Sequence, residues 1–459
     1  MGAERSERGP IGGAEPPRRH VRSVREGDLA QPHPLYVVWE ITLRCDLGCR
    51  HCGSRAGKAR DDELDTLRAL ETVDELAELG VREVTLIGGE AYLREDWDVI
   101  ARAITDRGMT CGLTTGARGL NAERVARAEA AGVRAVSVSI DGLEDTHDAQ
   151  RNVKGAFRSA IDALARLSKT SIRAGCNTQI NRLSMPELHA LGRRLVEAGM
   201  RAWQIQLTVP MGNAADRPRL LLQPYELLAL YPWLVHIERS VMRPAGATLY
   251  PGNNLGYFTP FEGALRYGGS RGAHWGGCPA GEWSLGLEAD GKVKACPSLP
   301  SEGYTGGMLG ERPLAEMVRE APEITALARR TRADLWGRCG DCYYADVCKA
   351  GCSWTAQVFF GRPGNNPYCI HRALELEREG RCERLDLVEA APGRPFDQGR
   401  YSVTEEDLPD VSPTLSGFDL DTCLQLEPSS AGIWSPEARA DILRARTEHL
   451  PTRGLPILA

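Results

Sequence analysis

The sequence has neither an excess of basic residues nor a long apolar run. Over 459 residues, 62 Asp and Glu face 56 Lys and Arg, which gives a formal net charge of −6. Nucleic acid is therefore not expected as a partner, because phosphate binding needs a basic surface. No apolar run approaches the roughly 18 residues of a membrane-spanning helix. The charged, Gly- and Pro-rich N-terminus also lacks the apolar core of a secretion signal.

Cysteine is too sparse for a secreted disulfide scaffold, with 14 residues in a chain of this length. We therefore expect a cytoplasmic protein with reduced thiols, where clustered cysteines indicate metal or redox chemistry. The hydrophobic fraction of 42% is too high for a disordered chain.

The cysteines are clustered, with three at positions 45, 49 and 52 and seven between 278 and 369. Their distribution divides the chain into five expected segments. These are a polar leader (1–34), a segment with the first cluster (35–215), a linker with a helix at 219–234 and a Gly/Asn-rich loop (216–275), a cysteine-rich segment (276–384) and a tail (385–459). We expect the tail to pack on the core or form a lid, and to end in a helix at Pro436–Leu450.

The 35–215 segment alternates short apolar runs with amphipathic stretches. The expected strands are Tyr36–Ile41, Glu83–Ile87, Thr110–Thr114, Ala135–Ile140, Ser171–Ile180 and Ala202–Val209. The expected helices include Asp65–Leu79, Glu95–Arg107, Ala122–Ala131 and Phe157–Ser168. This order predicts parallel strands with crossover helices, and six such units suffice for a partial barrel. Chemistry in such folds lies at the carboxyl ends of the strands. The residues that follow those ends are Cys45, Gly88, Thr115, Asp141, Asn181 and Gln206.

The first cluster, WEITLRCDLGCRHC, runs from a strand into a Cys-x3-Cys-x2-Cys loop. Three thiolates at this spacing can converge on one metal centre. A structural zinc site usually needs four ligands. A [4Fe–4S] cluster with three cysteines keeps one iron open for a substrate or cofactor. Zinc remains the alternative at this point.

The spacing of Cys45, Cys49 and Cys52 directly after the first strand resembles the signature of the radical S-adenosylmethionine (SAM) superfamily. His51 stands where that family often has an aromatic residue near the adenine. The resemblance implies that the open iron is chelated by SAM. One electron then cleaves SAM to a 5′-deoxyadenosyl radical, which abstracts a substrate hydrogen.

Further segments resemble the family in order along the chain. Gly88, Gly89 and Glu90 match a Gly-Gly-Glu segment that holds the SAM amino group, although Ala91 replaces the usual Pro. The resemblance also implies that further polar residues contact SAM, namely Thr115, Ser139, Asp141 and Arg151. Read alone, Gly88–Gly89 and Asp141–Gly142 are ordinary turns, and His147 and Asp148 are an exposed helix start.

The second cysteine set begins with Cys278 and Cys296, which flank a predicted β-hairpin with an Asp290–Gly291 turn. With the RCGDCYYADVCKAGC segment and Cys369, it resembles the SPASM extension of radical SAM enzymes. The resemblance assigns Cys278, Cys296 and Cys352 to auxiliary cluster I. It assigns four others to auxiliary cluster II: Cys339, Cys342, Cys348 and Cys369. A zinc ribbon is the alternative for the four-cysteine part.

Three clusters need about twelve ligands, and the motifs supply ten cysteines. One vacancy belongs to SAM and the other to auxiliary cluster I. Candidates for the latter are His274 and a substrate thiolate, although a pocket histidine is the simpler interpretation of His274. The four remaining cysteines are expected to be small core residues: Cys111, Cys176, Cys382 and Cys423.

The resemblance implies an α/β fold, with a partial (β/α)6 TIM-like barrel followed by a small β-hairpin/helix SPASM domain. The implied function is an oxidoreductase that modifies a peptide or protein side chain with SAM and three [4Fe–4S] clusters. The implied electron donor is a flavodoxin or ferredoxin. The leader is too short for a winged peptide-recognition domain. Pocket candidates are Gln204, Gln206, Tyr257 and His274. The alternatives are a small-molecule radical SAM dehydrogenase and a non-catalytic metal-binding or scaffold protein.

Overall fold

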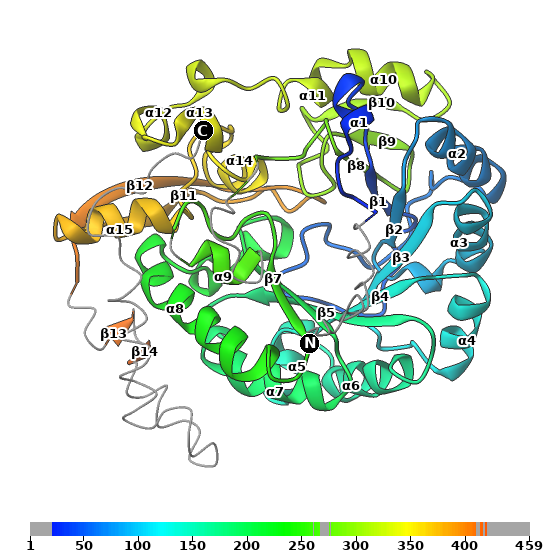
Figure 1. Cartoon of the computed structure of the whole chain (residues 1–459), viewed down its shortest axis with the longest axis horizontal. Coiled ribbons are helices and arrows are strands. Elements are labelled where there is room, and N and C mark those ends of the chain that lie inside the picture. Colours follow the sequence, from blue (N-terminus) through cyan, green and yellow to red (C-terminus); the bar gives the residue numbers. More distant parts are fainter. Residues whose placement is uncertain are drawn as a thin grey trace, which may run out of the picture.

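A curved sheet of ten strands forms the centre of the computed structural model (Figure 1). The structure describes residues 21–259, 261–266, 275 and 277–409, and the backbone of two short strands, β13 (Thr414–Leu415) and β14 (Phe418–Asp419). The spatial order of the sheet is β10-β9-β8-β1-β2-β3-β4-β5-β6-β7. Strands β1 to β7 run parallel in sequence order, and β8 runs parallel to β1 on its other edge.

The six expected strands are confirmed, with small differences at their ends. They are β1 (Tyr36–Glu40), β2 (Glu83–Ile87), β3 (Thr110–Thr115), β4 (Ala135–Ser139), β5 (Arg173–Ile180) and β6 (Ala202–Leu207). The predicted α/β class with a parallel sheet is confirmed.

Helices cover the outer face of the barrel strands (Figure 1). They are α2 (Thr66–Glu78), α3 (Trp97–Asp106), α4 (Ala122–Ala130), α5 (Glu144–Arg151), α6 (Ala156–Leu167) and α7 (Leu188–Glu197). Side-chain caps start two of them: Asp65 accepts a hydrogen bond from the Arg68 amide, and Asn121 accepts one from the Arg124 amide. The four expected helices are confirmed, α5 contains the helix start suggested at His147 and Asp148, and α7 was not among the expected helices.

The linker differs from the expected helix at 219–234. Two short 3₁₀ turns, Pro218–Leu220 and Pro224–Glu226, precede α8 (Leu227–Ile237). Pro224 lies at the first position of the second turn, where its missing N–H costs little. The linker also contributes an unexpected strand, β7 (Thr248–Pro251), which extends the sheet beyond β6.

The expected hairpin is present as β8 (Ser284–Leu287) and β9 (Lys292–Lys294), and it joins the barrel sheet through β1. Gly291 has a φ of +90° in the turn, a conformation that favours glycine. Strand β10 (Thr305–Met308) adds to β9. The expected segment limits stay predictions, since the sheet runs unbroken across several of them.

Buried charges join this hairpin to the end of β1. Arg60 lies 3.2 Å from Glu40, 3.1 Å from Glu288 and 3.2 Å from Asp290. Lys294, which is fully buried, lies 2.6 Å from Glu288. The cations lie between the carboxylates, so each buried charge has an opposite partner.

Short helices and the β11–β12 hairpin make up much of the rest of the described chain. The helices are α1 (Glu26–Ala30), α9 (Glu262–Arg266), α10 (Leu314–Glu320), α11 (Pro322–Thr325), α12 (Arg338–Asp341), α13 (Ala345–Cys348), α14 (Ser353–Phe360) and α15 (Ile370–Arg378). The hairpin pairs β11 (Arg381–Glu389) with β12 (Arg400–Asp407). The predicted Pro436–Leu450 helix and Cys423 lie outside the described residues.

The connection between β11 and β12 reaches the first cysteine loop. The Phe396 amide donates to the Gly53 carbonyl at 3.0 Å, and Arg55 Nε donates to Asp397 at 3.0 Å. The Gly212 amide donates to the Asp397 carbonyl at 2.8 Å. The beginning of the expected tail therefore packs against the core of the molecule.

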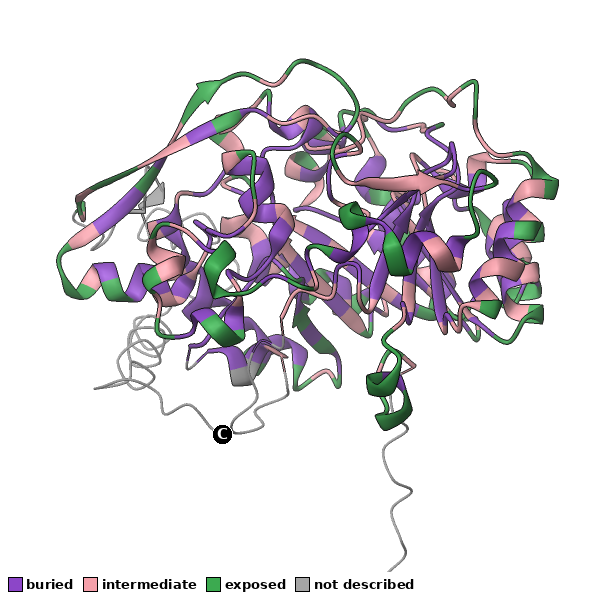
Figure 2. Cartoon of the chain, turned by 90° about the horizontal axis from the view of Figure 1, so that it is seen from above, coloured by how far each residue is buried: buried purple, intermediate pink, exposed green. Residues whose placement is uncertain are grey.

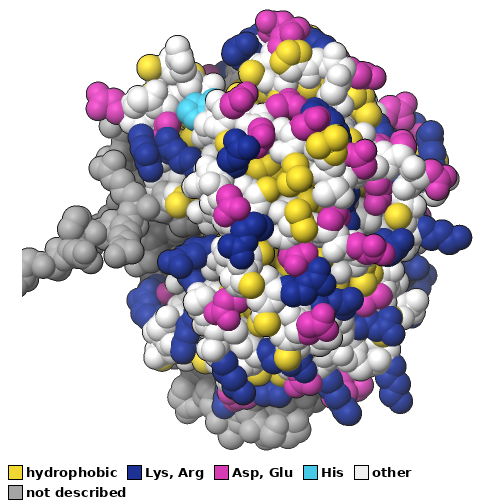
Figure 3. All heavy atoms as spheres, turned by 90° about the vertical axis from the view of Figure 1, so that its right-hand side faces the viewer, with side chains coloured by type: hydrophobic (Ala, Val, Ile, Leu, Met, Phe, Trp, Pro, Cys, Tyr) yellow, Lys and Arg dark blue, Asp and Glu magenta, His cyan; other side chains and the backbone are white. Residues whose placement is uncertain are grey.

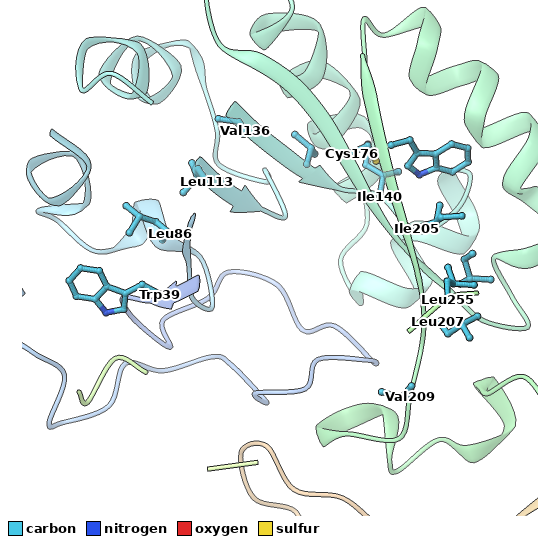
Figure 4. Close-up of a cluster of buried hydrophobic side chains, with 14 of the residues drawn as sticks. Trp39, Leu86, Leu113, Val136, Ile140, Cys176, Ile205, Leu207, Val209 and Leu255 are labelled. Carbon is cyan, nitrogen blue, oxygen red and sulfur yellow. The ribbon is translucent and has the colours of Figure 1, made fainter. Parts of the chain in front are cut away.

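Buried residues concentrate on the strands and on the inner faces of the helices (Figure 2). On the face over α2 to α4, charges of both signs are interspersed (Figure 3). Trp39, Leu86, Leu113 and Val136 occupy paired positions on β1 to β4 and form a continuous row beneath the helices (Figure 4). Cys111 and Cys176 are buried in this core, as expected. No helix among the described residues is long and apolar enough to cross a membrane.

Candidate functional site

The first cysteine loop leaves β1 at the carboxyl end of the barrel and folds back on itself. The Cys45 amide donates to the Gly57 carbonyl at 3.0 Å, and the Cys52 amide donates to the Cys49 carbonyl at 3.3 Å. Burial raises the pKa of the Cys45 thiol to about 12, and the nearby Glu90, Cys49 and Cys52 raise it further. The three thiols are therefore close enough to affect each other's ionisation.

Gly88 and Gly89 lie directly under this loop. A Cβ atom on Gly88 would lie 2.3 Å from the Thr42 carbonyl oxygen, and one on Gly89 would lie 2.5 Å from those of Leu43 and Arg44. The Gly89 amide donates to the Thr42 carbonyl, and the Glu90 amide donates to the Arg44 carbonyl, both at 2.8 Å. The described contacts of the two glycines thus hold the cysteine loop against β2.

Glu90 is a buried carboxylate with one oxygen left without a partner. Oε2 accepts a hydrogen bond from the Gly116 amide at 2.9 Å, and Thr115 also bonds the carboxylate. Oε1 is buried with no hydrogen-bond partner. Burial raises the pKa of Glu90 to about 8, so a cationic or N–H donor ligand would satisfy this group.

Asp141, at the end of β4, is the centre of a second buried network. Its Oδ2 lies 2.5 Å from Arg151 and 3.2 Å from His51, and its Oδ1 accepts from the Gln179 amide at 2.9 Å. Burial by itself would raise the pKa of Asp141, but Arg151 and His51 lower it below its usual value. Asp141 is therefore an anion held by two partners.

Arg151 connects this network to the cysteine loop. Its Nη1 donates to Cys49 Sγ at 3.5 Å, and its backbone carbonyl accepts from the Gly48 amide at 3.1 Å. The buried guanidinium thus lies between the Asp141 carboxylate and a thiol of the first cluster. His51 and Arg151 were expected to contact SAM, and in this structure both are engaged by Asp141.

His147 is not an exposed residue at a helix start, as the sequence suggested. It lies inside α5, is fully buried, and its Nδ1 accepts a hydrogen bond from the Asp141 amide at 3.1 Å. Burial lowers the pKa of His147 to about 3. This neutral histidine therefore fixes the backbone at the end of β4.

Alternate residues of the strands line the barrel interior. On β6, Trp203, Ile205 and Leu207 are buried in the core, whereas Gln204 and Gln206 are partly exposed. Trp203 packs towards Gly192 of α7, so the two glutamines point the other way, into the barrel. Ser139 is likewise partly exposed on the inward face of β4. The interior near these residues is polar.

Cys278, Cys296 and Cys352 form the second group of thiols. Burial, followed by the neighbouring Cys278, raises the pKa of Cys296 to about 11 and that of Cys352 to about 12. Ser353 Oγ donates to Cys278 Sγ at 3.3 Å, and Arg330 donates to the same hydroxyl at 3.0 Å. The hairpin and the start of α14 thus bring together cysteines that are 74 positions apart (278 to 352).

The third group lines a hollow of its own. The four cysteines around it are Cys339, Cys342, Cys348 and Cys369. Burial, then Cys369 and Cys339, raises the pKa of Cys348 well above its usual value. His371 also lines the hollow. Burial lowers its pKa, but the neighbouring Cys342 and Glu375 outweigh burial and raise it to about 9.

Tyr257 lies between the second and third groups. It is 1% exposed, its hydroxyl donates to the Asn253 carbonyl at 2.7 Å, and that hydroxyl accepts from the Cys352 amide at 3.0 Å. Tyr257 is therefore buried beside the thiols, where it also lines the hollow of the third group, and its place in a substrate pocket stays a prediction. His274 lies outside the described residues.

Sequence reasoning missed the residues that support the first loop from a distance. Arg55 donates to Asn213 at 2.9 Å and to Asp216 at 2.6 Å, and Asn213 Nδ2 donates to the Cys49 carbonyl at 2.8 Å. No local motif marks these partners, since they lie more than 150 positions apart in the chain.

Among the described residues, no three His, Cys, Asp or Glu side chains are arranged to hold a single metal ion. A zinc ion needs its ligands about 2.0–2.3 Å from one point. A [4Fe–4S] cluster binds each thiolate through a different iron, so its cysteines surround a volume rather than a point. The hollow lined by four cysteines and the free oxygen of Glu90 fit iron–sulfur and SAM ligands.

Comparison with known proteins identifies the family. Residues 39–187 match the Radical SAM superfamily. An AdoMet-dependent heme synthase of Methanosarcina barkeri is 31% identical over 350 residues, covering 74% of this chain and 97% of that protein. The chain belongs to the radical SAM superfamily. The radical SAM resemblance seen in the sequence is thereby confirmed.

Two further similarities extend over most of the chain. Mycofactocin maturase MftC of Mycobacterium ulcerans is 29% identical, covering 80% of this chain and 96% of that protein. The solved structure of native anSMEcpe with bound AdoMet and Kp18Cys peptide has a TM-score of 0.60 at 14% identity. It covers 74% of this chain and 95% of that one. Because the identity is only 14%, the similarity to this solved structure supports the fold of the chain alone.

Proposed function

We propose that this radical SAM enzyme is an oxidoreductase that modifies a side chain of a peptide or protein. The observation that carries the proposal is the grouping of ten cysteines into three sets of neighbours around one parallel barrel. The similarity to a mycofactocin maturase and to anSMEcpe with bound peptide supports the class of substrate. We place the reaction in the cytoplasm, where the thiols stay reduced.

In this proposal Cys45, Cys49 and Cys52 hold a [4Fe–4S] cluster that binds SAM. Cys278, Cys296 and Cys352 hold auxiliary cluster I. Auxiliary cluster II is held by four cysteines: Cys339, Cys342, Cys348 and Cys369. When bound, the first cluster and SAM supply a carbon radical that abstracts a substrate hydrogen, and the auxiliary clusters accept electrons. The fourth ligand of auxiliary cluster I is His274, a substrate thiolate or an open position.

The chain itself positions the reactants. The free oxygen of Glu90 is suited to the SAM amino group, and Thr115 and the Gly116 amide hold the carboxylate in place. Ser139 and the network of Asp141, Arg151 and His51 are candidates for the ribose and carboxylate end. Gln204 and Gln206 offer amide groups to a substrate inside the barrel.

A direct test compares single cysteine variants of the anaerobically reconstituted enzyme. We expect the wild type to hold about twelve irons, four for each cluster, and to form 5′-deoxyadenosine with dithionite. Cys45→Ala should lose SAM cleavage. Cys339→Ala should keep SAM cleavage but lose oxidation of a peptide encoded beside the gene. Cys382→Ala, outside the three groups, is the matched control and should behave as wild type.

Two results would contradict the proposal. Bound zinc without iron would favour the non-catalytic alternative. Full peptide turnover by Cys339→Ala would remove the role given to auxiliary cluster II.

A second candidate is the oxidation of a small molecule, and one observation favours it. The relative with 31% identity is an AdoMet-dependent heme synthase, whose product is not a peptide. Mass spectrometry of parallel reactions with the peptide and with a porphyrin substrate separates the two candidates. Turnover of the porphyrin alone would select the second.

A further inference from the structure

A surface hollow of about 820 Å³, open solvent included, lies beside the first cysteine loop. Its wall combines the C-terminal end of α5, the turn after β5 and the segment that follows β6. The lining mixes apolar residues with arginines, among them Leu183, Leu220, Arg50, Arg217 and Arg219. Leu183 is 43% exposed, so its side chain adds apolar surface to the hollow.

The hollow is positively charged. Its one acidic residue, Asp216, accepts two hydrogen bonds from Arg55 at 2.6 and 2.9 Å, and the three arginines of the lining outnumber it. Among the described residues no carboxylate forms a salt bridge with Arg50, Arg217 or Arg219. The charges of these three arginines are thus available to an acidic partner.

Hydrogen bonds connect Arg217, which lines the hollow, to the cysteine loop. Arg217 Nη1 donates to the Asn213 carbonyl at 2.7 Å and to the Arg50 carbonyl at 3.3 Å. Asn213 Nδ2 in turn donates to the Cys49 carbonyl at 2.8 Å. Arg50 itself lies between Cys49 and His51 in the chain. A molecule seated here would lie next to the thiols proposed to hold the SAM-binding cluster.

We infer that this hollow is the docking surface for an acidic one-electron donor protein. The inference rests on the proposed function, in which each SAM cleavage consumes one electron from outside the chain. The donor would be oxidised by one electron, and the [4Fe–4S] cluster that Cys45, Cys49 and Cys52 would hold would be reduced by that electron. Electron transfer weakens steeply with distance, so a donor gains from binding beside Asn213 and Arg217, which are hydrogen-bonded to the cysteine loop.

The character of the surface fits such a partner. Unpaired arginines steer an acidic protein to the site and speed its association. Leu183 and Leu220 supply apolar contact area beside these arginines. A small interface of this kind is typical of transient redox complexes, which bind weakly and release quickly.

The test uses the reconstituted full-length enzyme with two reductants. One is dithionite, and the other is a flavodoxin reduced by its NADPH-dependent reductase. The variants are Arg219→Glu and Leu183→Asp, alone and combined, because neither side chain is hydrogen-bonded to the cysteine loop among the described residues. Arg193→Glu, on the exposed side of α7, is the matched control.

We expect the combined variant to form 5′-deoxyadenosine at the wild-type rate with dithionite. With flavodoxin its rate should fall at least about ten-fold, because the charge reversal repels the acidic donor. Raising the ionic strength should slow the flavodoxin-driven rate of the wild type and of Arg193→Glu, and should have little effect on the combined variant.

The other outcomes are distinct from these. If flavodoxin drives the combined variant as well as it drives Arg193→Glu, the docking surface is wrong while the proposed function stands. If the combined variant raises the KM for the substrate equally with both reductants, the hollow binds substrate and the inference is overturned. Failure of the wild type to cleave SAM with dithionite would instead remove the proposed function itself.

Discussion

Single buried residues carry most of the chemistry expected of this enzyme. Glu90 and Asp141 are both buried carboxylates near the first cysteine loop, yet their surroundings differ. Asp141 is paired with Arg151 and His51, which lower its pKa. Glu90 has a free oxygen and a raised pKa, so it is the one prepared to receive a ligand.

We predict that Glu90→Gln weakens SAM binding while it stabilises the protein. Loss of a charge-assisted hydrogen bond worth roughly 1.5–3 kcal/mol corresponds to about a 10- to 100-fold weaker affinity. Equilibrium binding of SAM to the reconstituted enzyme measures this change. Glu123→Gln, an exposed residue of α4, is the control and should bind SAM as wild type does.

The same variant has a pH signature. Burial raises the pKa of Glu90 from 4.5 to about 8 in the folded protein. Its contribution to stability is therefore complete below pH 4.5 and is lost as the pH rises through about 8. Denaturant unfolding without SAM should show the advantage of Glu90→Gln over wild type growing from pH 6 to pH 9. An advantage that shrinks over this range would contradict the assignment.

At the scale of elements, the joint between β1 and the β8–β9 hairpin depends on Arg60. Three buried carboxylates surround its guanidinium, from Glu40, Glu288 and Asp290. Burial raises the pKa of Glu40 to about 7, although Arg60 lowers it, so the charge of Glu40 is only partly compensated. We therefore expect the position of the β8–β9 hairpin to depend on the positive charge of Arg60.

We predict that Arg60→Ala costs about 3–5 kcal/mol of unfolding free energy, because it leaves buried carboxylates without their partner. Glu40→Gln should cost less than about 1 kcal/mol at pH 7 and should be more stable than wild type at pH 8, where wild-type Glu40 must ionise. Anaerobic urea unfolding of the two variants at both pH values checks this. Equal losses in both variants would show that Arg60 acts through packing alone.

Sequence periodicity predicted the positions of the helices and strands better than it predicted which strands pair with each other. The spacing of apolar residues located all six barrel strands, because alternation and amphipathic helices are local properties. It did not foresee that β7 and β8 extend the sheet at both edges, since pairing depends on residues far apart in the chain. For β6, the burial of Trp203 and Ile205 decides which face Gln204 and Gln206 share, and the sequence alone left that open.

The cysteines show the same limit at the site. Their spacing predicted three groups, because the ligands of one group lie in a short motif or beside one hairpin, and the cluster that each group holds stays a prediction. The burial of Tyr257 and His147, by contrast, depends on which elements cover them. Both residues are polar enough to be expected at a surface, and both are inside the protein.

For the whole molecule, the first cysteine loop is held by segments from distant parts of the chain. Arg55 bonds Asn213 and Asp216 after β6, and it also bonds Asp397 in the β11–β12 connection. Arg55 adopts a φ of +49°, which is costly for a non-glycine residue and persists only where the surroundings fix it. We therefore regard this residue as the tie between the barrel and the C-terminal hairpin.

We predict that Arg55→Ala and Asp397→Ala each speed the loss of iron from the first cysteine loop to a chelator, because each loosens that loop. The double variant should be less destabilised than the sum of the two, with a coupling of about 0.5–3 kcal/mol. Arg384→Ala is the control. It removes exposed ion pairs on β11 and should change the free energy of unfolding by less than about 1 kcal/mol. Additive effects would show that the two segments support the loop independently.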